Sequence, residues 1–144
     1  MKTVTFTAIA IMTLGLVSCE GYVSTVRNET TDCVRWYSCE FCVNCWTECC
    51  DAEGLNRYYK ADVSVYHLSG EVIRAGQVSC YMYVDNDVQA PLPSVRHYEN
   101  NEGQMWTRTI DYDYYCGGMT IYVTDSDFAG GVPGPMAFRV MLSW

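Results

Sequence analysis

The chain has 144 residues, nine cysteines and a formal net charge of −8. This length suits a single domain. Because so acidic a chain is not attracted to a phosphate backbone, the composition argues against nucleic acid as a partner. The same charge excludes a cationic peptide that disrupts anionic membranes.

The first predicted element is a secretory signal peptide over residues 1–19. Lys2 is followed by an apolar run over residues 4–17 and then by small residues before Cys19, which is the pattern of a cleaved export signal. The run is too short to cross a bilayer comfortably. We therefore expect a secreted, extracellular protein.

Two further features bear on export. The ending Leu-Val-Ser-Cys over residues 16–19 also matches a bacterial lipoprotein signal, in which the cysteine carries a lipid, so bacterial lipoprotein and eukaryotic secretion both stay open. The triplet that starts at Asn28 (Asn-Glu-Thr) predicts a glycoprotein with N-glycosylation at this residue.

The next element is a cysteine-rich segment over residues 20–57. Once Cys19 is removed with the signal, an even set of cysteines remains, and in a short exported chain such a set predicts a disulfide framework. Its members are Cys33, Cys39, Cys42, Cys45, Cys49, Cys50, Cys80 and Cys116. Because six of them crowd into residues 33–50, we expect crosslinks rather than a hydrophobic core to hold this segment together. The Cys42/Cys45 pair has zinc-ligand spacing, but overlapping pairs without a nearby histidine favour disulfides.

Most of the remaining chain is predicted to form short strands separated by Gly/Pro turns. A short first strand over 21–26, one helical turn within 46–59 and a loop over 71–77 complete the prediction. The main strands cover residues 61–68, 79–84, 105–112, 118–124 and 136–143. With almost no amphipathic helix, this pattern predicts an all-β, antiparallel β-sandwich over residues 58–144.

The two histidines carry no catalytic pattern. His67 falls on a predicted strand, with Leu68 on the strand's opposite side, and His97 falls in a predicted polar loop. Neither belongs to a Ser–His–Asp or Cys–His grouping, so we expect no enzyme.

The strand over residues 118–124 carries the clearest alternation. From residue 119 its odd-numbered positions are apolar and its even-numbered positions are Thr or Tyr, as in a half-buried strand. Because alternate residues share a side, Asp125 and Asp127 are predicted to leave the strand end in the same direction. Two such carboxylates repel each other, and a hard cation such as calcium, which takes oxygen ligands, would relieve the repulsion.

The chain contains three Asp-x-Asp pairs, which are Asp85/Asp87, Asp111/Asp113 and Asp125/Asp127. Aspartate is common at strand ends and in turns, where its side chain caps local backbone groups. Backbone capping is therefore the alternative to metal binding at each pair.

Three stretches between residues 49 and 128 carry a family resemblance. They are the adjacent cysteines before ADVSVYHLSGEV, the run ENNEGQMWTRTIDYD, and GGMTIYVTDSDF. Together they resemble the C2 domain family, as represented by the C-terminal C2 domain of perforin. The resemblance implies a C2-like, eight-stranded sandwich whose loops at one end bind calcium and then lipid headgroups. It matches Asp125 and Asp127 to the start of the third calcium loop and Glu71 to the first.

The chain also departs from the family pattern. Ser79 stands at the second ligand position of the first loop, and the later acidic cluster of the third loop is replaced by the Gly-Gly-Val-Pro-Gly run over 130–134. Losing anionic ligands lowers the expected calcium affinity. Asp85 and Asp87 remain as additional candidate ligands.

Two functions follow from these expectations. The first is a secreted, disulfide-stabilised C2-like binding module that uses calcium to bind membrane lipid or a cell-surface protein. The alternative is a metal-free secreted effector, such as a toxin-like, defence or signalling ligand, that acts by protein–protein contact. Asp125 and Asp127 with Glu71 favour the first function, and the Gly/Pro-rich loop favours the second.

Overall fold

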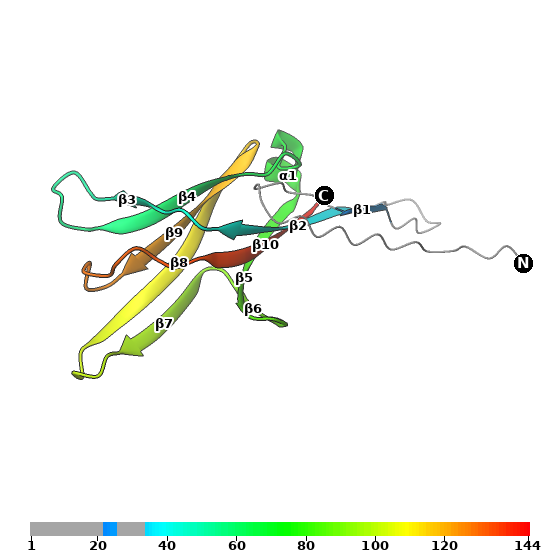
Figure 1. The fold of residues 1–144 in the computed structure, drawn as a ribbon. Helices are drawn as coiled ribbons and strands as arrows, with labels where there is room; N and C mark the ends of the chain where they lie inside the picture. Colours follow the sequence, from blue (N-terminus) through cyan, green and yellow to red (C-terminus); the bar gives the residue numbers. More distant parts are fainter. Residues whose placement is uncertain (1–21, 26–33) are drawn as a thin grey trace, which may run out of the picture.

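The computed structural model describes residues 22–25 and 34–144, which form two antiparallel five-stranded sheets (Figure 1). Sheet A has the strand order β1-β2-β10-β5-β6, and sheet B has the order β3-β4-β9-β8-β7. The predicted all-β class is confirmed at this level. The predicted signal peptide, Asn28 and Cys33 lie outside the described residues.

The strands are between three and eleven residues long. Sheet A contains β1 (Tyr22–Thr25), β2 (Arg35–Val43), β10 (Met136–Ser143), β5 (Gln77–Asp85) and β6 (Val88–Pro91). Sheet B contains β3 (Thr47–Cys49), β4 (Tyr58–Ser64), β9 (Gly118–Asp125), β8 (Met105–Tyr115) and β7 (Ser94–Glu99). The helix α1 (Gly70–Ala75) connects β4 to β5, and no helix in the described ranges is long and apolar enough to cross a membrane.

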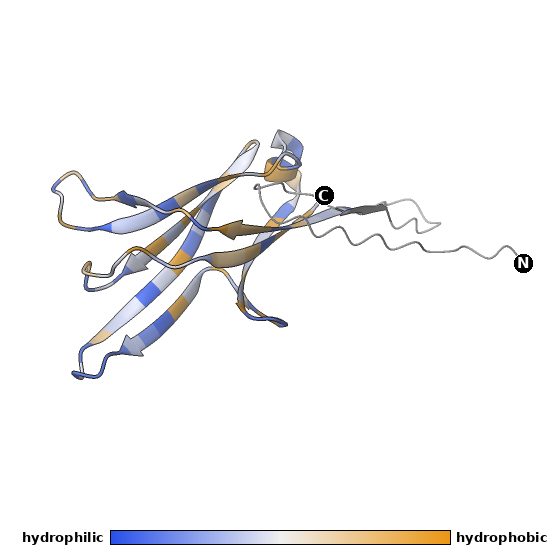
Figure 2. Cartoon of the chain, viewed as in Figure 1, coloured by the Kyte–Doolittle hydropathy of each residue, from blue (hydrophilic) through white to orange (hydrophobic). Residues whose placement is uncertain are grey.

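The strongest sequence patterns are confirmed. β10 has the predicted bounds, β9 extends the predicted strand by one residue, and Met119, Ile121 and Val123 are buried. Figure 2 shows hydrophobic colour along β2 and β10 in the middle of sheet A and hydrophilic colour on much of β7. This contrast follows position, because β7 is an edge strand and β10 has a neighbour on each side.

The cysteine-dense segment contributes to the core. Eight residues of β2 pair with β10, and the odd-numbered residues from 37 to 43 are buried. Because alternate residues share a face, Cys39 fills an apolar position while Cys42 faces outward. The expectation that crosslinks rather than a hydrophobic core hold residues 33–50 is therefore wrong for β2, whose buried face is part of the sandwich core.

Two predicted loops form regular structure. Over 71–77 the chain forms most of α1, where Ser69 is the N-cap and its Oγ accepts a bond from the Val72 amide at 3.4 Å. Glu71 in the first turn suits the positive end of the helix dipole. His97 lies on β7 rather than in a loop, and its Nδ1 is 2.9 Å from the Thr107 hydroxyl on β8.

Two other local predictions also differ from the structure. The helical turn expected within 46–59 is replaced by β3 and a turn, with Gly54 at a φ of 71°. The strand predicted over 61–68 ends at Ser64. A turn follows, closed by the Leu68 amide donating to the Val65 carbonyl at 3.0 Å. Leu68 is fully buried, as part of this turn rather than of the predicted strand.

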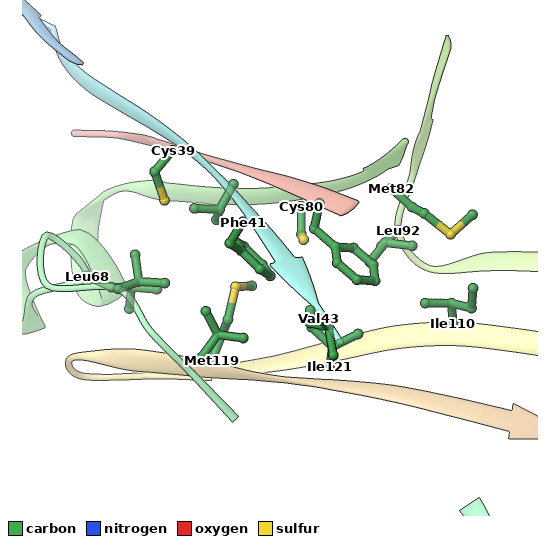
Figure 3. Close-up of a cluster of buried hydrophobic side chains, with 14 of the residues drawn as sticks. Cys39, Phe41, Val43, Leu68, Cys80, Met82, Leu92, Ile110, Met119 and Ile121 are labelled. Carbon is green, nitrogen blue, oxygen red and sulfur yellow. The ribbon is translucent and has the colours of Figure 1, made fainter. Parts of the chain in front are cut away.

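The inner faces of the two sheets enclose one hydrophobic core. Figure 3 shows Phe41 and Cys80 from sheet A facing Met119 and Ile121 from sheet B. These side chains are all nearly or fully buried. Burial of these inner positions on both sheets is what holds the two layers together.

The strand register restricts disulfide pairing in the core. Val140 on β10 is the partner of both Cys39 on β2 and Cys80 on β5. The two cysteines are therefore two strand spacings apart, about 10 Å, which exceeds the reach of a disulfide. A Cys39–Cys80 bridge would require the sheet to rearrange.

Burial also sets the reactivity of Cys80. Loss of solvent around its thiol raises the pKa of Cys80 to about 12, so little thiolate forms near neutral pH. In reduced native protein we expect iodoacetamide to modify Cys80 at least about tenfold more slowly than the exposed Cys116. Peptide mass spectrometry after timed quenching measures both rates. The rates should converge in urea, and equal rates in the native state would contradict the buried position.

Candidate functional site

The predicted metal ligand Asp125 forms an ion pair with Arg108 inside the sandwich. The two residues are register partners on β9 and β8 and project from the inner face of sheet B. Arg108 Nε donates to Asp125 Oδ1 at 2.7 Å, and Nη2 donates to Oδ2 at 2.8 Å. The Asp125 side chain is 7% exposed and that of Arg108 is 25% exposed. This bidentate bond satisfies both carboxylate oxygens and raises the pKa of Arg108.

The loop over residues 126–135 covers this ion pair. A β-carbon at Gly130 would overlap Asp125 Oδ2, so glycine is required for the loop to pass this close. The Gly130 carbonyl accepts bonds from the Tyr59 hydroxyl at 3.3 Å and from Arg57 Nη2 at 3.4 Å. The glycine-rich sequence that departs from the C2 pattern thus packs on the carboxylate.

Asp127 lies in a different environment. The Phe128 amide donates to the Asp125 carbonyl at 2.9 Å, which closes a turn in which Phe128 adopts a φ of 52°. Within this turn Asp127 is exposed and its Oδ1 accepts a bond from the Ala129 amide at 3.2 Å. One carboxylate of the predicted pair is therefore buried and paired with arginine, and the other caps a turn.

The remaining predicted ligands lie on elements other than the end of β9. Glu71 is on α1, which lies beside the start of β9 because the Gly117 amide donates to the Leu68 carbonyl at 2.8 Å. Asp125 is the last residue of that strand, about 23 Å further along. Asp85 ends β5 and Asp87 lies in the turn to β6, so both belong to sheet A, whereas Asp125 belongs to sheet B.

The predicted metal ligands are not arranged around a common cation position. Within residues 22–25 and 34–144 no group of three or more His, Cys, Asp or Glu is placed to share a metal ion. A calcium ion would also have to displace Arg108 from Asp125, since both carboxylate oxygens already accept bonds. The donor set at Asp125 therefore does not fit calcium.

Most of the cysteines in the described part of the chain lie at the surface. Thiols without a disulfide are found at Cys42, Cys45, Cys49, Cys50, Cys80 and Cys116. Of these, Cys80 is buried and Cys49 is half-buried, while the others are exposed. The disulfide framework stays a prediction.

A second polar site lies on the outer face of sheet B, around the Asp111/Asp113 pair identified from the sequence. Asp111 and Asp113 occupy adjacent outward positions of β8, because β8 continues past the predicted strand end. Asp111 is the register partner of Tyr122 on β9. The ring of Tyr58 on β4 lies 6.1 Å from that of Tyr122. Three neighbouring strands thus contribute to one surface.

These side chains surround an open pocket of about 290 Å³, here called the Asp111–Asp113 pocket. It is lined by Tyr58, Asp111, Tyr112, Asp113, Tyr122 and Thr124. Partial burial and the charge of Asp113 raise the pKa of Asp111. Partial burial and a hydrogen bond to Asp113 raise the pKa of Tyr122. The surroundings of Asp111 therefore make its ionised form less favourable than that of an isolated aspartate.

No protein-family model matches the chain, and no curated protein or solved structure matches it.

The ion pair at the end of β9 should be important for stability. We expect Arg108→Met, which keeps an apolar stem but removes the charge, to lower the free energy of unfolding by about 3–5 kcal/mol because Asp125 is left buried without a partner. Urea unfolding measures this change. Asp127→Asn is the matched control and should change stability by less than about 0.5 kcal/mol, since an amide oxygen also caps the turn. A loss below about 1 kcal/mol for Arg108→Met would contradict the assignment.

At the Asp111–Asp113 pocket, removal of a charge should instead increase the free energy of unfolding. The raised pKa of Asp111 means that the folded state favours its protonated form, so wild-type stability falls as pH rises through that pKa. Asp113→Asn removes the neighbouring charge, and we expect a gain of roughly 0.2–1 kcal/mol at about pH 7 that disappears near about pH 2.5. Urea unfolding at both pH values tests this, with the exposed Asp87→Asn as control. A loss of stability at neutral pH would contradict it.

Proposed function

We propose that this chain is an exported, metal-free binding module that acts by direct contact with a protein partner. The observation that carries the proposal is the Arg108–Asp125 bond, because a cation supplied by the chain itself occupies the carboxylate that calcium would need. Export is proposed from the signal-like residues 1–19.

The proposed fold type is a C2-like sandwich. Its support is the sequence likeness between residues 49 and 128 together with the two antiparallel sheets. β1 pairs with β2 at the edge of sheet A and adds a strand beyond the resembling segment. Calcium-dependent binding to membrane lipid is the second candidate function, favoured by the likeness of Asp125 and Asp127 to the start of the third calcium loop in the C2 pattern.

A role in binding rather than catalysis is part of the proposal. The ring of His67 lies 4.1 Å from that of Tyr37, and His97 pairs with Thr107 on the outer face of sheet B. In the described part of the chain both histidines therefore have structural neighbours that suit packing and strand pairing better than proton transfer.

A calcium titration separates the two candidate functions. We expect the melting temperature of the wild-type protein to stay constant up to about 5 mM calcium, because Arg108 neutralises Asp125. A site with a dissociation constant of about 50 μM would instead add about 2.7 kcal/mol of stability at this concentration. Differential scanning fluorimetry and calorimetry measure both outcomes.

A variant of the Arg108–Asp125 ion pair serves as the control for the calcium titration. Calcium stabilisation of the wild-type protein that is lost in Asp125→Asn would overturn the metal-free proposal. Sedimentation with phosphatidylcholine–phosphatidylserine liposomes, with and without calcium, then tests the lipid step. Calcium-dependent sedimentation of the wild-type protein would support the second candidate instead.

A further inference from the structure

The outer face of sheet B carries negative charge that the described residues do not neutralise. The ion pairs in the described part of the chain are Arg57–Glu48, Lys60–Asp62 and Arg108–Asp125. Asp111 and Asp113 belong to none of them. Lys60 is the register partner of Tyr122 on β4, but its ammonium lies 3.5 Å from Asp62. Among the described residues, Asp111 and Asp113 therefore have no ion-pair partner, although Asp113 accepts a hydrogen bond from Tyr122.

Two tyrosine rings in this pocket provide a second feature that attracts a cation. Tyr58 and Tyr122 lie beside the carboxylates, with their rings at 55° to each other. A tyrosine face attracts a cation, and a guanidinium can stack on such a ring while it donates to a carboxylate. The pocket, at about 290 Å³, is small for a drug-sized ligand but suits a single long side chain.

We propose that the Asp111–Asp113 pocket binds an arginine side chain from a basic segment of a protein partner. The proposal rests on the metal-free binding function above and names the chemistry of its partner. Asp111 and Asp113 supply the acceptors, and Tyr58 and Tyr122 supply ring faces on the neighbouring strands. Arginine suits the site better than lysine because its planar fork bonds carboxylates in two directions and stacks on aromatic rings.

Repulsion between Asp111 and Asp113 in the unbound protein supports a role in binding a cation. Two carboxylates on adjacent outward positions of one strand repel each other, and the pKa of Asp111 is raised by burial and by Asp113. A bound guanidinium would relieve this repulsion. Charge complementarity also excludes the opposite class of ligand, since an anionic lipid or a phosphate would add to the repulsion.

The test uses the peptide acetyl-Gly-Arg-Gly-Arg-Gly-amide and its citrulline counterpart, which keeps the shape but not the charge. Amide chemical shifts of the ¹⁵N-labelled full chain are followed during titration. We expect the arginine peptide to shift the amides of residues 58, 111–113 and 122, and the citrulline peptide to shift none of them. Shifts centred on another surface would overturn the proposal.

Matched variants separate a specific pocket from general acidity. Asp111→Asn/Asp113→Asn should weaken binding by about tenfold, whereas Asp85→Asn/Asp87→Asn, which removes the same charge from another exposed Asp-x-Asp pair, should weaken it less than about twofold. Equal weakening by the two double variants would overturn the proposal. So would binding that survives Asp111→Asn/Asp113→Asn unchanged, with the melting temperature of each variant confirming that it is folded.

The peptide titration and the calcium titration test the two proposals separately. If the peptide does not shift the pocket and calcium does not stabilise the protein, the arginine proposal fails while the metal-free function stands. If calcium stabilises the wild-type protein through Asp125, the metal-free function fails whatever the peptide does.

Discussion

A carboxylate that is removed from water needs a counter-charge, and at Asp125 the sheet itself provides one. The register between β8 and β9 places Arg108 directly opposite, so the two charges meet as soon as these strands pair. A buried pair of this kind adds little net stability, but removal of either partner is costly. The loop over residues 126–135 then packs on an already neutral surface, with Gly130 against the carboxylate. Pairing of β8 with β9 thus determines that Asp125 is neutralised by Arg108 and covered by the loop.

Strand β8 connects the two sites because its residues alternate between the faces of sheet B. Arg108 points inward to Asp125, whereas Asp111 and Asp113 point outward beside Tyr122. On the inner face the charge is compensated within the chain. On the outer face it is not, and the molecule keeps repulsive carboxylates at its surface. A protein commonly accepts such a local cost where its surface is used for binding.

Part of this structure could be predicted from sequence. The alternation in β9 and β10 specified their strands because core burial imposes a period of two. Arg108 could not be recognised as the partner of Asp125, since 17 residues separate them and only the register brings them together. β7 was missed because an exposed edge strand needs no apolar alternation. Helix α1 is a single short element whose only local signal was the cap at Ser69.

The edge position of β7 has a further consequence. Among the described strands β7 pairs only with β8, so one side of its backbone is open to hydrogen bonding by another chain. Arg96 and Glu99 are exposed along this edge. Charged side chains on an open strand discourage uncontrolled sheet extension, because a second strand would have to bring their charges together. Substitutions that neutralise these residues for crystallisation or engineering would therefore remove a safeguard against fibrous self-assembly, even where they leave the core untouched.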